Sequence, residues 1–238
     1  MQHPRWLFLA VVLAAPAGGG AEERWAGHQV LLGARNLPIL GRLETRSESF
    51  QLARVQRSEE GLRLVQQTCR MEIAPVAGVT VRFLPEGVPK MPPSVIEYVR
   101  RKDRWEGGPW VTEWNEEDVD GDGKPGATLV VEAPICGGTL YVGGFSRAST
   151  RATEKEGGIV GEMRARVGHR ILGTSGGCLR LVARDSEESV SGTFAYVPVP
   201  PDATCESLLA GPWPVRAPEI PPPPEKAAAE PGSRRKLR

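Results

Sequence analysis

The sequence predicts an all-β, antiparallel fold. Polar and apolar residues alternate with a period of two in several stretches, Gly, Pro and acidic turn residues separate these stretches at short intervals, and there is one helix signal. About eight or nine strands joined mainly by tight turns form either a barrel or a two-sheet sandwich. We prefer a meandering barrel, because small inward residues such as Gly161 and Ala165 suit strongly coiled strands.

The expected strands share alternating or β-branched apolar residues. They lie at 42–55, 62–73, 79–83, 127–132, 139–152, 159–167, 179–184 and 192–199. The first two form a long hairpin with a bulge near Ser49 and Phe50. A short helix is expected from Ser94, because Ser94 and Glu97 have the spacing of a capping box after two prolines, and it ends by Arg104.

The N-terminus has the pattern of an export signal. A basic start precedes an apolar run at 7–15 and a small-residue cleavage pattern at 15–17. That run is shorter than the roughly 20 residues that a helix needs to cross a bilayer, so it predicts no transmembrane segment. We assign 1–20 as the signal peptide and expect a periplasmic or extracellular protein.

The rest of the chain is divided by composition into three parts. Residues 21–41 form a lead segment without a clear pattern, and 42–210 form the antiparallel β domain. Residues 211–238 are rich in proline and end in a basic run, which predicts a disordered tail. The 30 Lys and Arg balance 29 Asp and Glu, so no overall field attracts a nucleic acid. The partner is unknown.

Four cysteines remain after the signal: Cys69, Cys136, Cys178 and Cys205. An even number of cysteines in an exported chain predicts two disulfides, and four cysteines allow three connectivities. Our guess pairs Cys69 with Cys136 and Cys178 with Cys205. A zinc site is disfavoured, since the chain has no CxxC pair and its histidines are few and scattered.

An acidic loop at 118–126 carries the strongest functional signal. Asp118, Asp120 and Asp122 stand at alternate positions, and Gly123 follows the last of them. Three like charges within five residues repel each other unless a cation screens them, and calcium takes oxygen ligands from such a loop. The alternative is an acidic turn that holds no metal.

This loop resembles the DxDxDG calcium loops of FG-GAP and VCBS repeats and, more loosely, EF-hand loops. The resemblance implies that Asp118, Asp120 and Asp122 are side-chain ligands and that Lys124 offers its backbone carbonyl. Gly126 and Leu129 stand where those families place further acidic ligands. We therefore expect weak calcium binding, at about 10⁻⁴ to 10⁻³ M or weaker, with a structural role. A cation in this loop lacks one or two of the expected ligands unless water or one of three glutamates completes the shell; the glutamates are Glu116, Glu117 and Glu132.

The whole chain also resembles exported bacterial proteins of myxobacterial type that combine a DxDGDGxPG loop with β-strands, a resemblance that implies no activity. We expect a non-enzymatic domain. Neither His28 nor His169 lies in a catalytic or metal-binding motif, and Ser175 lacks the spacing of a nucleophile elbow. The alternative is a lipocalin-like carrier, because a barrel of this size encloses one small apolar ligand.

Overall fold

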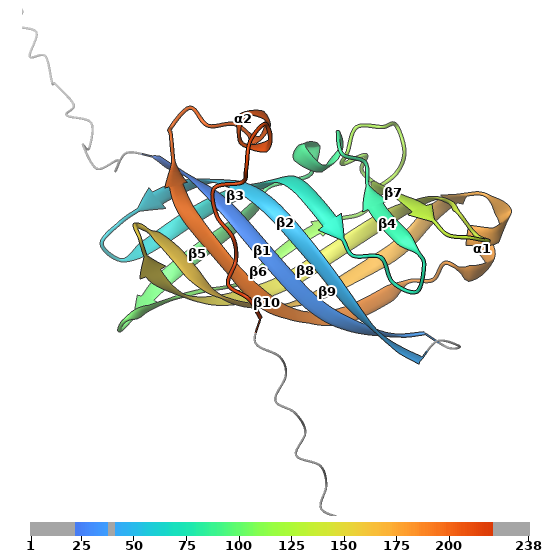
Figure 1. Ribbon diagram of the computed structural model, residues 1–238, viewed down its shortest axis with the longest axis horizontal. Helices are drawn as coiled ribbons and strands as arrows, with labels where there is room; N and C mark the ends of the chain where they lie inside the picture. The colour runs from blue at the N-terminus through green and yellow to red at the C-terminus, as the bar shows by residue number, and fades with distance from the viewer. Residues whose placement is uncertain (1–21, 38–40, 221–238) are drawn as a thin grey trace, which may run out of the picture.

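The computed structural model describes residues 22–37 and 41–220, so the predicted signal peptide lies outside the described residues. Most of this range is strand (Figure 1). The strands are β1 (Glu23–Leu37), β2 (Gly41–Arg57), β3 (Gly61–Ile73), β4 (Thr80–Phe83), β5 (Ser94–Arg101), β6 (Arg104–Trp114), β7 (Ala127–Glu132), β8 (Gly138–Lys155), β9 (Gly158–Ser175) and β10 (Ser186–Val199). The helices are the 3₁₀ turn η1 (Val88–Lys90) and the short α1 (Gly177–Val182) and α2 (Cys205–Leu209).

Eight of these strands form a closed ring. β1, β2, β3, β5, β6, β8, β9 and β10 each pair with the next, and β10 pairs with β1, so the ladder returns to its start. Every pairing between strands is antiparallel, which confirms the predicted all-β antiparallel meander. The predicted hairpin of β2 and β3 is also present, with its register shift between Phe50 and Gln51.

β6 and β7 lie end to end along the same edge of β8. Trp114 at the end of β6 pairs with Gly144, and Ala127 at the start of β7 pairs with Val142, two positions away on β8. The segment 115–126, which contains the acidic loop, therefore connects two strands that lie nearly on one line. β4 pairs with the outer edge of β7.

Apolar side chains fill the ring from one face of the strands. Alternate residues point to the same face of a strand, and they supply the buried cluster inside the ring. Its largest members are Trp25, Tyr98, Trp105, Phe194 and Tyr196. A second cluster, around Phe83, Leu129 and Val142, lies where β4 and β7 join the sheet.

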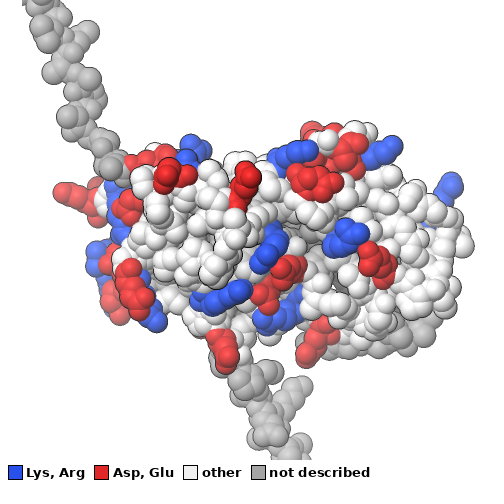
Figure 2. All heavy atoms as spheres, turned by 45° about the horizontal axis from the view of Figure 1, so that its top comes forward, with Lys and Arg blue, Asp and Glu red and all other residues white. Residues whose placement is uncertain are grey.

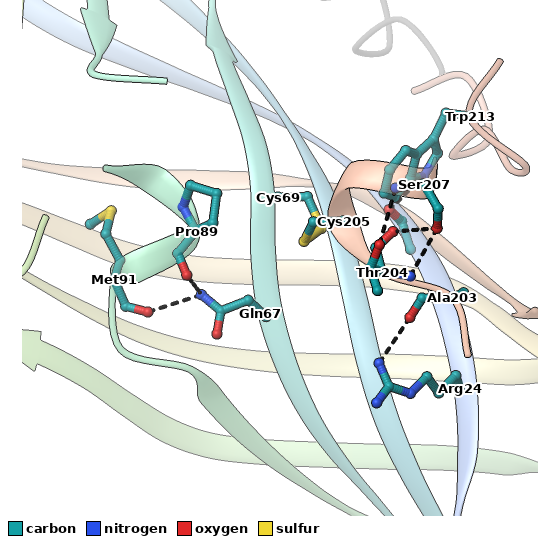
Figure 3. Close-up of a disulfide and its surroundings, with 11 residues drawn as sticks. Arg24, Gln67, Cys69, Pro89, Met91, Ala203, Thr204, Cys205, Ser207 and Trp213 are labelled. Carbon is teal, nitrogen blue, oxygen red and sulfur yellow. Dashed lines mark hydrogen bonds between the residues drawn. A yellow bond between two sulfur atoms is a disulfide. The ribbon is translucent and has the colours of Figure 1, made fainter. Parts of the chain in front are cut away.

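The outer face of β1, β2 and β3 is covered by a segment that we call the C-terminal strap, residues 203–218 (Figure 3). Cys205 in the strap is bonded to Cys69 in β3, and the Trp213 indole donates to the Gly27 carbonyl at 3.0 Å. Trp213 packs against Phe50, with ring centroids 5.5 Å apart. At the start of the strap, Arg24 donates to the Ala203 carbonyl at 2.9 Å. The strap therefore shields apolar residues on the outer face of β1 and β2, such as Phe50 and Leu52, from solvent.

Two local predictions were wrong. The helix expected from Ser94 is strand β5, in which Ile96 and Tyr98 are buried and the Ser94 hydroxyl bonds Thr112 at 2.8 Å rather than capping a helix. Pairing with β3 and β6 and burial on alternate positions outweigh a capping pattern of four residues. The strand expected at 179–184 is largely helix α1, where Leu179 alone is buried.

The disulfide guess was also wrong. The bonds join Cys69 to Cys205 and Cys136 to Cys178, because the strap returns to β3 while the β7–β8 connection lies beside α1.

Two predicted boundaries need correction as well. The lead segment contains β1, a strand of the ring, and residues 211–220 of the expected disordered tail include the buried Trp213. The remainder of that tail, 221–238, lies outside the described residues.

Candidate metal site in the acidic loop

The acidic loop is closed at its base by the backbone. The Gly126 amide donates to the Glu117 carbonyl at 2.9 Å, and the Val119 amide donates to the Gly126 carbonyl at 3.1 Å. Gly126 has a φ of 72°, and a Cβ there would lie 2.2 Å from the Val142 carbonyl oxygen. Only glycine fits at this position, where the chain leaves the loop and enters β7.

Asp118 organises the turn through backbone amides. One carboxylate oxygen, Oδ1, accepts from Gly121 at 2.7 Å and from Asp122 at 3.1 Å, and Oδ2 accepts from Gly123 at 2.8 Å. These bonds, with that from Gly123 foremost, lower the pKa of Asp118, because they stabilise the ionised carboxylate. Asp118 is therefore a charged, preorganised member of the loop.

Asp122 and Asp120 are both tied to Thr128 in β7. Oδ2 of Asp122 accepts from the Thr128 hydroxyl at 2.6 Å, while its Oδ1 accepts from the Lys124 amide at 2.8 Å. Oδ2 of Asp120 accepts from the Thr128 amide at 2.7 Å. The first residues of β7 thus set the positions of two of the three carboxylates.

Asp120 is the unusual member of the set. It is only 3% exposed, and its Oδ1 is buried without a hydrogen-bond partner among the described residues. The segment before η1 covers it so closely that a Cβ on Gly87 would lie 2.6 Å from the Asp120 Cβ. Burial raises the pKa of Asp120, and the charges of Asp122 and Asp118 raise it further.

The structure brings all three predicted carboxylates together. Each of Asp118, Asp120 and Asp122 offers an oxygen, and these oxygens lie within 4.8 Å of one another. Hard carboxylate oxygens at this spacing suit a hard divalent cation such as calcium. The arrangement is therefore able to hold one ion between Asp120 and its two more exposed neighbours.

The three glutamates considered as further ligands lie near other partners. The Glu132 carboxylate pairs with Arg82 at 3.1 Å, and the Glu117 carboxylate accepts from the Asn115 amide at 2.9 Å. Glu116 lies 4.0 Å from Arg170. The Lys124 carbonyl stays a prediction as a ligand.

Sequence reasoning missed two residues that shape the site, Thr128 and Gly87. Thr128 was assigned to a strand, and its position two residues after Gly126 is the only sequence signal for its bonds to the loop. Gly87 lies in a different stretch of the chain, and no local pattern links it to Asp120.

Comparison of the chain with models of known families, with curated proteins and with solved structures gave no match. Among the described residues, no helix is long and apolar enough to cross a membrane.

Proposed function

We propose that the acidic loop binds calcium and that the ion stabilises an exported, non-enzymatic β domain. The observation that carries this proposal is the buried, unpartnered Oδ1 of Asp120 between two further carboxylates. A buried polar atom without a partner costs free energy, and a bound cation would supply that partner. The same ion would offset the repulsion among the three charges.

The expected affinity is modest. The backbone bonds to Asp118 hold the loop in shape before an ion arrives, which lowers the cost of ordering it. However, three carboxylates supply fewer oxygens than the six to eight that calcium takes, so backbone carbonyls or water must complete the shell. A dissociation constant of about 10⁻⁴ to 10⁻³ M follows from this ligand set.

The two disulfides support the proposed export. All four cysteines of the mature chain are paired in the structure, and such bonds persist in oxidising compartments. A lipocalin-like carrier gains no comparable support, because a cluster of large side chains, including Trp25, Phe194 and Tyr196, is buried inside the ring.

The test is a calcium titration of the mature chain by calorimetry, with the melting temperature measured in parallel. At ten times the dissociation constant, calcium should raise the melting temperature by about 3 to 6 °C. Asp120→Asn keeps an oxygen for the Thr128 amide but removes the charge, and it should abolish both the binding heat and the shift.

The matched control is Asp103→Asn, which alters an exposed aspartate in the turn between β5 and β6. This variant should respond to calcium like the parent. Absence of a calcium response in the parent, or an undiminished response in Asp120→Asn, refutes the proposal. A magnesium titration tests the choice of ion, since the smaller ion demands a stricter octahedral shell.

A further inference from the structure

One end of the molecule carries aliphatic side chains that are largely exposed to solvent. Ile135 is 94% exposed, Leu181 73% and Val182 61%. Ile135 lies in the connection between β7 and β8, and the other two lie on α1. We call these three residues the apolar tip.

The apolar tip is held rigidly. The disulfide between Cys136 and Cys178 joins the β7–β8 connection to α1. Leu179 also anchors the helix. It is 4% exposed, and its Cδ1 packs close to Gly138 at the start of β8. A rigid segment that presents aliphatic residues loses little conformational entropy when they are buried by a partner.

Two exposed arginines, Arg180 and Arg184, lie on α1 and just after it. Neither forms a salt bridge with another described residue. The acids next in sequence to the two stretches that build this end, 133–138 and 171–184, are Glu132 and Asp185, and both are bonded. The Glu132 carboxylate pairs with Arg82 at 3.1 Å, and the Asp185 carboxylate accepts from the Ile171 amide at 2.8 Å. Figure 2 shows the same end of the molecule nearly bare of charge apart from a basic group, in contrast to the mixed charges elsewhere on that face.

The shape of this end favours a lipid surface over a protein partner. α1 lies at one end of the long axis of the molecule, so the tip meets a surface end-on (Figure 1). Stable protein interfaces bury broad faces of about 800 Å² on each partner, which three protruding side chains do not provide. Insertion into the boundary between headgroups and acyl chains requires only that aliphatic groups leave water while arginines stay near anionic headgroups.

We propose that the apolar tip docks the protein on an anionic lipid surface. Ile135, Leu181 and Val182 enter the apolar layer, and Arg180 and Arg184 contact the lipid phosphates. This proposal is independent of the calcium site, which involves none of these residues.

The test is flotation of the mature chain with vesicles of phosphatidylcholine, with or without phosphatidylglycerol. The parent should float with the anionic vesicles. The double variant Ile135→Ser, Leu181→Ser should bind them at least about tenfold more weakly, since two aliphatic side chains no longer leave water. The matched control is Val111→Ser, which removes another exposed aliphatic residue, 54% exposed, from β6. It should float like the parent.

A second variant tests the charges. Arg180→Gln, Arg184→Gln should reduce the preference for anionic vesicles by about tenfold or more, because each arginine near the surface contributes roughly fivefold. Failure of the parent to float, or equal flotation of the tip variant, overturns the proposal, as does retained anionic preference in the arginine variant. A parent dimer in sedimentation that the tip variant loses would assign the tip to a second copy of the chain instead. Unchanged melting temperatures in all three variants confirm that the fold is intact.

Discussion

The two disulfides hold two segments that differ in the burial of their apolar side chains. The bond from Cys69 to Cys205 fastens the C-terminal strap, which buries Trp213 against Phe50 on the outside of the ring. The bond from Cys136 to Cys178 fastens the apolar tip, where Ile135 is 94% exposed. The comparison shows that a disulfide fixes where a segment lies, whereas the packing partner decides whether its apolar residues are buried.

Removal of a disulfide should lower the free energy of unfolding more than any other change proposed here. The bonds span 136 and 42 residues, and the chain-entropy model values them at about 5 and about 4 kcal/mol. Cys69→Ala, Cys205→Ala should therefore lower the free energy of unfolding more than Cys136→Ala, Cys178→Ala, as measured by urea denaturation.

The two disulfide variants should also differ in the surface that they expose. Only loss of the Cys69–Cys205 bond releases the strap from an apolar face, so only that variant should gain binding of an apolar dye under native conditions. Equal dye binding by both variants would contradict the assignment of the strap as a cover.

A smaller effect should follow from truncating one apolar residue in each segment. Trp213→Ala removes a buried indole and its bond to the Gly27 carbonyl, and it should lower the free energy of unfolding by about 3 kcal/mol. Leu181→Ala should change it by less than about 0.5 kcal/mol, because that side chain is already 73% exposed. Similar costs for both variants in urea denaturation would show that the tip is packed in solution.

The smallest expected effect on stability is a pH dependence that comes from His28, which lies beneath the strap. The His28 Nδ1 accepts from the Ala217 amide at 2.9 Å, and Nε2 lies 3.1 Å from Glu48. Burial lowers the pKa of His28, with smaller contributions from Arg216 and Arg46, although Glu48 opposes this shift. The folded state therefore takes up a proton at lower pH than the unfolded state, and stability falls as pH drops below about 6.5.

The measurement for His28 is the difference in melting temperature between about pH 7.5 and pH 5. His28→Gln should reduce the loss at low pH relative to the parent, because the buried imidazole that resists protonation in the folded state is gone. An equal loss in His28→Gln and the parent would show that other groups carry the pH dependence.

Much of the strand structure was readable from the sequence, because alternation with a period of two is a local property. Alternation placed β2, β3 and β9, and apolar or β-branched content placed β7 and β8. The spacing of Asp118, Asp120 and Asp122 predicted that their carboxylates lie close together, and their oxygens lie within 4.8 Å of one another. The helix expected at Ser94 and the strand expected at 179–184 were wrong. At Ser94, pairing with β3 and β6 outweighed a short capping pattern.

By itself, then, the sequence determined an all-β chain with an acidic loop and two disulfides. Only the tertiary structure decided which cysteines pair, that Trp213 is buried by the strap, and that Gly87 covers Asp120. The physical reason is distance along the chain. Propensity and spacing act over a few residues, whereas burial and disulfide geometry depend on segments that the closed ring brings together.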